Sequence, residues 1–583
     1  ARTFTVLSGF VEEWRAERLD EVRPLLVRVA DAARRGHFVA GYLAYECAPA
    51  FDDALVVSSA PSEPARLPLA WFGVFAAREV VPLSLPDGPS NDDVDWNVAT
   101  SRDDHALAVK SILDDIAQGN AYQVNLTSPV VARDVDARGL YRRLVTAQQP
   151  AHAALLEFDG LAIASASPEL FVEWDGSLVR SRQMKGTAPR GRWPGEDDER
   201  VARLVASTKD RAENVMIADL VRNDLGRIAE VGTVEVTSLC EVERYPTVFQ
   251  MVSEVTAVTR PDVELVDVIA ATFPCGSVTG APKASAMGII AKTEAAPRGV
   301  YCGAVGLVSP SPRGVSARFN VAIRTAVVDQ REGTVRFASG GGVVADSTPE
   351  GEYRELVLKA EVLRGRDSSA TRLLDTFRVS VRSRNDHVER HVSRLRRSAD
   401  RLGYSVPDGL IELVASRCRD RDADARVRLL LSRRGDVDIE VDDAPRDDDA
   451  PVVLAIDDEP VDSADPSLFY KTTDRERYDR RRRRHPVADD VVMVNERGEC
   501  TETTIANLAV RVGSLWMTPP LSAGCLPGIE RERRVESGEL VEGTITVSDL
   551  RGAAEVAVLS SLRGWRRAVV RASETSTANA RRE

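Results

Sequence analysis

A short polar segment near residue 370 constrains the fold most, because it divides a chain too long for one hydrophobic core. The sequence RGRDSSATR at 364–372 interrupts the hydrophobic patterns on both sides. At 583 residues the chain exceeds the size at which single cores stop growing, so we predict at least two domains. We place a first domain at 1–365, a linker at 366–372, a second domain at 373–571 and a disordered tail at 572–583.

Charge and composition exclude several classes of protein. A net charge of -13 argues against general binding to nucleic acid or to acidic membrane surfaces. No apolar run approaches the roughly 20 residues that a membrane-spanning helix needs. The seven cysteines are scattered without a CxxC pair, which predicts a reduced, cytoplasmic protein with no zinc-site spacing.

Lysine is unusually rare, and this makes each lysine informative. Of 77 basic residues only seven are lysine. Of the two basic residue types, only lysine can lose its proton near neutral pH and act as a nucleophile or Schiff base, so each retained lysine has a better than usual chance of a chemical role. For Lys110, Lys209 and Lys292 we favour chance survival on a solvated surface.

Periodicity predicts mixed helices and strands in the first domain. Helical patterns cover 103–119, 196–223 and 349–364, and strand patterns cover 154–158, 161–165, 300–308, 317–328 and 335–338. Asp159-Gly160 predicts a hairpin between two of these strands.

Acidic residues on two predicted helices form a candidate magnesium site. Glu352, Glu355 and Lys359 share one helix face, and Asp210 and Glu213 form an acidic face on another helix. If the two faces converge, their carboxylates would bind Mg²⁺ and leave room for waters and a substrate carboxylate. From spacing alone, ordinary surface charge pairing is the alternative.

Glycine-punctuated loops and an arginine suggest an anionic substrate. Gly340 to Gly342 and the loop Pro274 to Lys283 would let backbone amides approach an anion closely. Arg324 lies within the predicted strand 317–328, where it could bind a carboxylate with two hydrogen bonds. The pattern indicates a small polyanion held by Mg²⁺, backbone amides and arginine.

Five motifs occur in order along the first domain: SPELF at 167–171, MKGT at 184–187, DRAENVMIADLVRNDLGR at 210–227, GSVTGAPK at 276–283 and DSTPEGEYRELVLKA at 346–360. With these motifs, residues from about 40 to 364 resemble the chorismate-utilising enzymes, which include anthranilate, aminodeoxychorismate, isochorismate and salicylate synthases. The resemblance implies chorismate as substrate and Mg²⁺ as cofactor, with Glu213 and Glu355 as leading metal ligands and Asp210 and Glu352 close by. It also implies that the substrate is held by Thr279, Gly280, Tyr301, Arg324, Gly341 and Lys359.

Lys185 distinguishes members of that group. Anthranilate synthases carry a small residue there, whereas aminodeoxychorismate synthases carry the lysine with a glutamate sixteen positions earlier, here Glu169. The resemblance implies that Lys185 adds at C2 and displaces the C4 hydroxyl, with Glu169 as acid and then base, before ammonia displaces the lysine. Ammonia would come from a glutamine amidotransferase partner. Two departures are Gln183 in place of proline and Gln250 in place of histidine; an anthranilate or isochorismate synthase is the alternative.

The second domain contains the motifs RHVSRL at 390–395, YKTT at 470–473, TETTIANL at 501–508 and LPGI at 526–529. With these motifs, residues 373–570 resemble the fold-type IV pyridoxal phosphate enzymes. The resemblance implies that Lys471 binds pyridoxal phosphate covalently, Glu502 pairs with its ring nitrogen and Arg394 grips its phosphate. It implies an aminodeoxychorismate lyase releasing 4-aminobenzoate, with an aminotransferase or a non-catalytic dimerisation module as alternatives, and a homodimer formed through this domain.

The two resemblances together imply an α+β chain. We expect a large antiparallel β-sandwich with flanking helices, followed by a two-lobed α/β pyridoxal phosphate domain.

Overall fold

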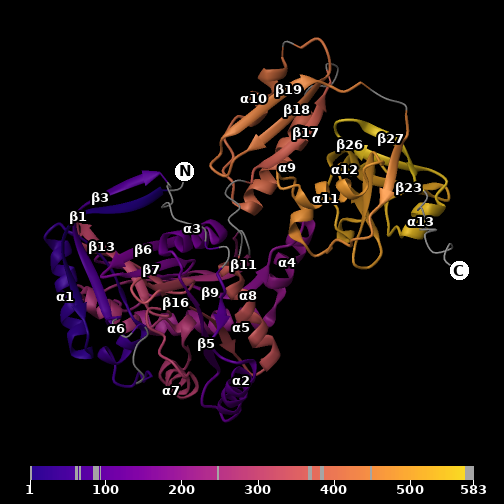
Figure 1. The fold of residues 1–583 in the computed structure, drawn as a ribbon. Helices are drawn as coiled ribbons and strands as arrows, with labels where there is room; N and C mark the ends of the chain where they lie inside the picture. The colour runs from indigo at the N-terminus through magenta and orange to yellow at the C-terminus, as the bar shows by residue number, and fades with distance from the viewer. Residues whose placement is uncertain are drawn as a thin grey trace. The chain divides into compact units, whose positions relative to one another are not determined.

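The computed structural model describes residues 3–58, 64, 67–82, 91, 94–245, 248–364, 371–380, 386–419, 421–446 and 450–571. The chain forms two compact units (Figure 1). The first contains Ala1–Pro189 and Val201–Asp367, and the second contains Arg190–Arg200 and Ser368–Glu583. Most of the predicted linker and all of the predicted tail lie outside the described residues.

The first unit contains a nine-stranded sheet in which all neighbouring strands are antiparallel. Its strands, in spatial order, are β1 (Thr3–Ala16), β3 (Ala70–Pro82), β2 (Phe38–Leu43), β13 (Ala304–Ser311), β14 (Gly314–Val321), β8 (Leu170–Trp174), β9 (Leu178–Pro189), β11 (Val248–Val258) and β10 (Glu235–Arg244).

A second antiparallel sheet packs against the first. Its strands, in order, are β12 (Gly280–Ala281), β5 (Gln123–Arg133), β16 (Thr334–Val343), β15 (Thr325–Asp329), β7 (Leu161–Ser167) and β6 (His152–Phe158), with β4 (Asn97–Val98) beside β5. Apolar side chains from both sheets share one core, in which the rings of Trp71 and Phe158 stack with centroids 4.3 Å apart. The predicted antiparallel sandwich is therefore confirmed.

Helices flank these sheets because each buries an apolar face. They are α1 (Leu19–Arg34), α2 (Arg102–Ala117), α3 (Ala137–Gln148), α5 (Thr208–Gly226), α6 (Leu265–Thr272), α7 (Lys283–Thr293) and α8 (Pro349–Ala360). Helix α4 (Pro194–Ala206) crosses the division of the chain, since its residues up to Arg200 belong to the second unit and those from Val201 belong to the first. Three 3-10 turns accompany them: η1 (Tyr45–Ala50), η2 (Gly276–Val278) and η3 (Glu361–Leu363). Helix α1 buries Val22, Leu26 and Val29 in one core, and α3 buries Leu140 and Leu144 in another.

The predicted strand at 317–328 is wrong, because the chain changes sheets within it. β14 pairs in the nine-stranded sheet, whereas β15 pairs with β7 and β16 in the other. Arg324 lies between these strands with φ +52°, a left-handed conformation that cannot continue a strand. The predicted helix at 196–223 is likewise divided, since the Ser207 side chain accepts a hydrogen bond from the Asp210 amide and caps α5.

The second unit has two lobes, as expected. The smaller lobe contains β17 (Leu373–Val379), β18 (Ala425–Leu431) and β19 (Val437–Asp443) with α9 (Asp386–Leu402) and α10 (Leu410–Cys418). The larger lobe has a mixed sheet in the order β22 (Cys500–Thr503), β21 (Asp490–Val494), β20 (Val452–Ile456), β27 (Gly564–Val570), β26 (Val556–Ser560), β23 (Asn507–Val512), β24 (Leu515–Thr518) and β25 (Val541–Glu542). With it lie η4 (Pro466–Phe469), α11 (Glu476–Arg484), η5 (Leu521–Ala523), α12 (Ile529–Glu536) and α13 (Val547–Gly552).

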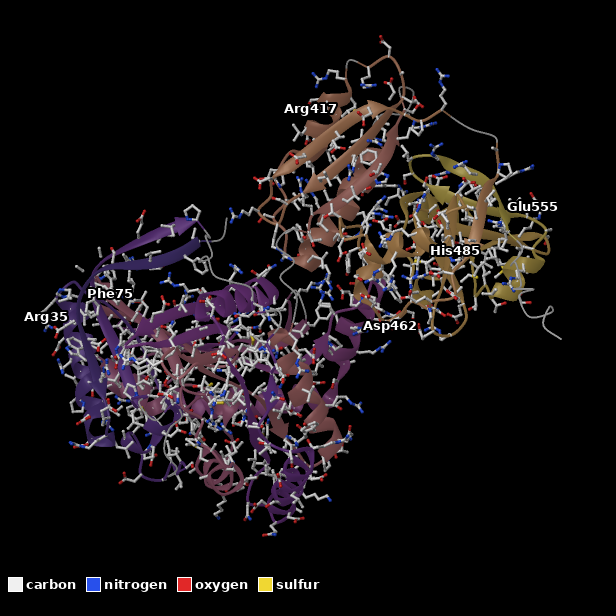
Figure 2. All side chains as sticks on the ribbon, in the orientation of Figure 1. Arg35, Phe75, Arg417, Asp462, His485 and Glu555 are labelled. Carbon is white, nitrogen blue, oxygen red and sulfur yellow. The ribbon has the colours of Figure 1, made fainter. Side chains whose placement is uncertain are left out.

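Side chains fill the space between the ribbons of each unit (Figure 2). All seven cysteines are buried. Within the described ranges, no helix is both long and apolar enough to cross a membrane.

Candidate active sites

Lys185 lies at a bulge in β9. In the pairing with β11, Lys185 and Gly186 together face the single residue Met251. Gly186 has φ +94°, a conformation that favours glycine and that bulges use to redirect a side chain. Asn214 on α5 donates its side-chain amide to the Lys185 carbonyl at 2.9 Å. The Lys-Gly sequence therefore creates the bulge, and α5 fixes it.

The side chains of Lys185 and of Gln123, at the start of β5, both approach the backbone at Gly342 of β16. A Cβ added to Gly342 would lie 2.8 Å from Lys185 Nζ and 1.9 Å from Gln123 Nε2. Position 342 must lack a side chain for these groups to approach the backbone. Gln123 is 1% exposed, and within the described part of the chain its Oε1 has no hydrogen-bond partner. A buried unpaired acceptor of this kind suits a ligand donor. Gln123 was not among the residues predicted from the sequence; its signal there was an amide inside a buried strand pattern.

The surroundings of Lys185 favour its neutral amine. Burial lowers the pKa of Lys185, and the Lys359 ammonium lowers it further. The carboxylates of Glu213, Glu355 and Glu169 act in the opposite direction without reversing the shift. A lysine with a lowered pKa can act as a nucleophile.

Glu169 precedes β8 and is 2% exposed. Burial raises the pKa of Glu169 to about 7, although hydrogen bonds from Ser277 and the Met184 amide and the nearby Lys185 charge oppose this rise. A carboxyl with this pKa is available as both acid and base near neutral pH. Glu169 and Lys185 therefore lie close enough for the charge of each to affect the pKa of the other.

The predicted acidic faces converge near Lys185. A Cβ on Gly341 would lie 3.0 Å from Glu352 Oε2 and 3.1 Å from Glu355 Oε1. From α5, the Asp210 Cβ lies 3.1 Å from the Cβ position of Gly186. Burial raises the pKa of Glu213, and the negative charges of Asp210 and Glu355 raise it further.

These carboxylates suit magnesium only together with other ligands. Burial would raise the pKa of Glu355, but the Lys359 ammonium, 2.6 Å away, lowers it overall. Glu352 accepts a 2.6 Å hydrogen bond from Ser347. In the described part of the chain, no three acidic, histidine or cysteine side chains lie close enough to hold a metal by themselves. One carboxylate from each helix plus substrate oxygens and waters is a donor set typical of Mg²⁺, so the residues fit that ion.

The predicted substrate-binding residues have different local roles. Arg324 donates to the Lys359 carbonyl at 2.6 Å, and burial lowers its pKa. Lys359 donates to the Gly340 carbonyl at 2.8 Å. Thr279 is fully buried and donates to the Cys275 carbonyl at 3.2 Å.

Gly280 lies in β12, and Tyr301 lies shortly before β13. Gly280 has φ +147°, and a Cβ there would lie 2.1 Å from the Gln123 carbonyl, so this glycine allows β12 to approach β5. Burial raises the pKa of Tyr301, which keeps its hydroxyl protonated as a hydrogen-bond donor.

Lys471 follows η4 in the second unit. The Leu374 amide donates to its carbonyl at 2.9 Å. Burial lowers the pKa of Lys471 to about 8; the charges of Arg394 and Arg475 act in the same direction, and those of Asp375 and Glu502 oppose it. The amine is therefore partly neutral at physiological pH, as covalent cofactor binding requires.

Glu502 and Arg394 complete the predicted cofactor set. Glu502 on β22 is 4% exposed, accepts a 3.2 Å hydrogen bond from Asn507, and has its pKa raised to about 8 by burial. Arg394 on α9 pairs with Asp375 at 2.7 Å and donates to the Pro527 carbonyl at 3.2 Å, next to the start of α12. A helix N-terminus beside a guanidinium suits a phosphate, so these residues fit pyridoxal phosphate.

Asp375 and His391 form a buried support that our sequence analysis missed. His391 Nδ1 lies 2.9 Å from Asp375 Oδ1, and its ring stacks on Phe377 with centroids 4.2 Å apart. Burial would raise the pKa of Asp375, but Arg394 and His391 hold it far below its usual range. The RHVSRL motif contained half of this network, and only the fold joins it to β17.

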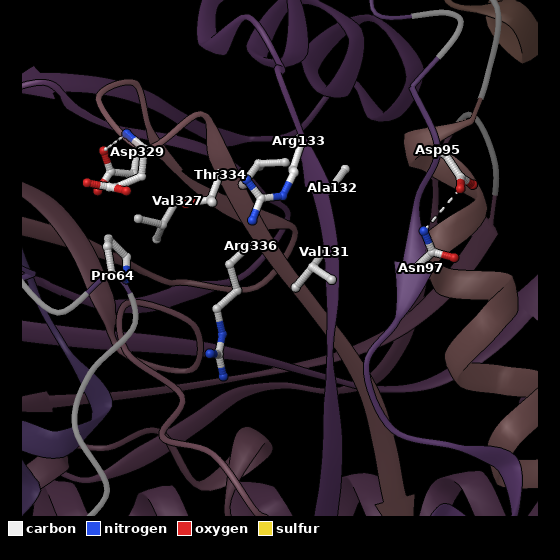
Figure 3. A pocket seen from close by; sticks show the side chains of 12 residues that line it. Pro64, Asp95, Asn97, Val131, Ala132, Arg133, Val327, Asp329, Thr334 and Arg336 are labelled. Atoms are coloured by element: carbon white, nitrogen blue, oxygen red, sulfur yellow. Dashed lines mark hydrogen bonds between the residues drawn. The ribbon is translucent and has the colours of Figure 1, made fainter.

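A separate cavity of about 790 Å³ lies in the first unit along β4, β5, β15 and β16 (Figure 3). Arg133, Arg336, Asp329 and Glu332 are among its charged lining residues, and Asn97 donates to Asp95 at its rim. None of the predicted site residues lines it.

Comparison with known proteins assigns the larger part of the chain. Residues 5–365 match the family described as chorismate binding enzyme. The chain belongs to this family. Residues 372–569 match the amino-transferase class IV family, so a chorismate-binding part is fused to a class IV aminotransferase part.

Similar proteins include several with curated names. The chain is 41% identical over 309 residues to aminodeoxychorismate synthase of Streptomyces griseus, covering 53% of this chain and 41% of that protein. It is 40% identical over 269 residues to a probable chloroplastic aminodeoxychorismate synthase of Oryza sativa, covering 45% and 30%. It is 40% identical over 259 residues to an anthranilate synthase component 1 of Haloarcula marismortui, covering 44% and 50%. The chain thus spans half or less of the length of these three relatives.

A solved structure supports the fold of the first unit. Anthranilate synthase component I from Streptococcus pneumoniae superimposes with a TM-score of 0.53 at 23% identity, covering 63% of this chain and 92% of that one. In sequence, the chain is almost as similar to the anthranilate synthase component 1 of Haloarcula marismortui (40% identical) as to the aminodeoxychorismate synthase of Streptomyces griseus (41% identical). The choice between these two activities therefore depends on individual residues.

Proposed function

We propose that the first unit aminates chorismate at C4, giving 4-amino-4-deoxychorismate. The observation that carries this proposal is the pairing of a nucleophile with an acid and base. Lys185 lies at a bulge and has a lowered pKa, and nearby Glu169 has a pKa of about 7. The similarity to aminodeoxychorismate synthases supports it, and the equal similarity to an anthranilate synthase makes Lys185 the deciding residue.

The proposed reaction consists of two displacements. The Lys185 amine forms a bond to C2 while the bond from C4 to its hydroxyl breaks, and Glu169 gives that hydroxyl a proton so that it leaves as water. Ammonia then bonds to C4 while the Lys185–C2 bond breaks, and the Glu169 carboxylate accepts the proton that ammonia loses. The net change replaces hydroxyl by amine at C4 with release of water.

The remaining residues hold the substrate during both steps. Mg²⁺ bound between the α5 and α8 carboxylates would neutralise a substrate carboxylate. Arg324 and Lys359 would hold the other carboxylate as cationic donors. Gln123 Oε1, buried and unpaired, would accept a hydrogen bond from a substrate hydroxyl or from incoming ammonia.

A glutamine amidotransferase is the proposed source of ammonia. That chemistry needs a reactive thiolate, and all seven cysteines of this chain are buried. Burial raises the pKa of Cys275, Cys500 and Cys525 to about 12, which keeps those thiols protonated. Amination by this chain with glutamine as the sole nitrogen source would contradict the proposal.

The second unit is proposed to eliminate pyruvate and release 4-aminobenzoate. Pyridoxal phosphate, when bound, supplies an electron sink for this elimination. Lys471 would remove the proton from C4 of the substrate, since its pKa of about 8 makes the free amine an effective base. Glu502 would hold a proton at the ring nitrogen, and Arg394 with the start of α12 would hold the phosphate. The substrate loses a proton at C4 and divides into pyruvate and the aromatic product, so the reaction needs no external oxidant.

One end-point experiment tests both units. The protein is given chorismate, Mg²⁺ and ammonium, with and without pyridoxal phosphate, and products are identified by mass spectrometry. We expect 4-aminobenzoate only with pyridoxal phosphate, and 4-amino-4-deoxychorismate without it. Anthranilate, isochorismate or salicylate would refute the assignment of Lys185. Accumulation of the amino intermediate despite pyridoxal phosphate would refute the second unit's role alone.

A further inference from the structure

A short segment from the chorismate-binding sequence is part of the second unit. Residues Arg190–Arg200 follow β9, the strand that carries Lys185, yet by their packing they belong with Ser368–Glu583. Neither family match predicts this, since the segment lies inside the chorismate-binding match and far from residue 372.

Ion pairs within the segment stabilise its conformation. Arg190 donates to Asp197 at 2.6 Å, and both side chains are nearly fully buried. Glu196 accepts from the Arg192 amide at 2.8 Å and from the Arg200 guanidinium at 2.7 Å. Although burial opposes it, these bonds lower the pKa of Glu196 to about 2. The segment consists of a short turn and the first half of α4, and these contacts hold it in one conformation.

The turn at the start of this segment contacts the residues that immediately precede Lys471. The Trp193 ring packs on Phe469 with centroids 5.4 Å apart. The Tyr470 hydroxyl donates to the Arg192 carbonyl at 3.2 Å, and Arg192 donates to the Ser463 carbonyl at 3.0 Å. Trp193 thereby joins the cluster of buried side chains around Leu468 and Phe469.

Lys471 is held from both sides. On its C-terminal side, β17 binds it through the hydrogen bond from Leu374 and the bridge between Leu373 and Thr472. On its N-terminal side, Phe469 is held by Trp193, and Tyr470 is held by the Arg192 carbonyl. Removing the second support would let the Lys471 side chain sample more positions, which costs binding energy for any partner that needs one of them.

We propose that Arg190–Arg200 is a positioning element of the second active site, with Trp193 and the Arg192 carbonyl holding the segment that presents Lys471. The inference rests on the proposed role of Lys471 in binding pyridoxal phosphate. It follows that a second unit cut from the chain at the family boundary lacks one of its own supports.

The test uses the full-length chain stripped of cofactor and titrated with pyridoxal phosphate. Trp193→Ala removes the ring contact, and Tyr470→Phe removes only the hydroxyl. Trp516→Ala is the matched control, because Trp516 is a partly buried tryptophan of the same unit that packs on Trp565 in another cluster. The readouts are cofactor affinity from the visible band of the lysine-bound cofactor, the apparent pKa of that band, and amination of chorismate with ammonium.

We expect Trp193→Ala to weaken cofactor binding about tenfold and to shift the pKa of the band, with a smaller change of the same sign in Tyr470→Phe. Trp516→Ala should leave both unchanged, and amination should continue in all three variants. Equal effects of Trp193→Ala and Trp516→Ala, or none from the first, would overturn the inference. If Trp193→Ala fails to fold, an unchanged affinity and band pKa in Tyr470→Phe would overturn it. Failure of the unaltered chain to bind the cofactor would instead refute the role of Lys471, and this inference with it.

Discussion

Replacing Glu169 by glutamine should change both stability and catalysis, and the structure gives the size of each effect. Burial raises the pKa of this carboxyl from 4.5 to about 7. The folded chain therefore holds the proton more tightly than the unfolded chain, so stability falls as pH rises through that window and the loss is complete above pH 7. At about 1.4 kcal/mol per pKa unit, the ionised carboxyl costs the fold about 3 kcal/mol.

Glutamine cannot ionise, so Glu169→Gln should escape this cost. Chemical denaturation of the first unit, followed by near-ultraviolet circular dichroism at acidic and at mildly alkaline pH, should show the variant gaining up to about 3 kcal/mol over the unaltered chain as pH rises. Amination with saturating ammonium should fall about 100- to 10,000-fold, the usual contribution of a general acid and base.

Glu173→Gln provides the matched control, because Glu173 lies on the neighbouring strand β8 and is partly exposed in an ion pair with Arg180. It should show neither the pH-dependent gain nor the loss of amination. A stability difference between Glu169→Gln and the unaltered chain that stays constant across pH would refute the assigned pKa. Amination above one-tenth of the original rate would refute the role in proton transfer.

Three further substitutions test other parts of the sites. Lys185→Ala should abolish formation of 4-amino-4-deoxychorismate while chorismate still binds, as measured by product analysis and equilibrium titration. Gly342→Ala should destabilise the first unit by about 1–3 kcal/mol and impair amination, because the new Cβ overlaps Gln123 and crowds Lys185. Gly226→Ala is the control: its Cβ meets open space, so it should change neither the free energy of unfolding in denaturation assays nor the rate of amination. Arg394→Ala should weaken pyridoxal phosphate binding about 10- to 100-fold in a spectroscopic titration, whereas Arg397→Ala, exposed on the same helix, should not.

Local sequence signals predicted local structure well. The hairpin around Asp159 and Gly160 was predicted from two residues, and both adopt the positive φ values that such a turn requires. The strand at 317–328 was wrong because its apolar pattern continues through Arg324 while the chain crosses between sheets. Periodicity reports which residues are buried, but it does not report in which sheet.

The site shows the same division between local and distant information. Motifs identified Lys185 and Glu169 as a pair, but the surroundings of Lys185 depend on a bulge and on Gln123, which lies on a strand 62 residues before Lys185. Asp375 lies outside the RHVSRL motif and reaches Arg394 only because α9 packs on β17. Such contacts depend on tertiary register, which no short motif encodes.

The scarcity of lysine gives a final argument about the sites. The three lysines interpreted as chance survivors, Lys110, Lys209 and Lys292, are all exposed in the structure. The other four are not exposed, and Lys283 is one of them, in a 2.7 Å ion pair with Asp224. The remaining three are Lys185, Lys359 and Lys471. Arginine could supply charge at an exposed position, but at 185 or 471 it would keep the charge and remove the amine that can lose its proton. A chain with arginine at nearly every other basic position therefore keeps lysine where the proposed chemistry requires it.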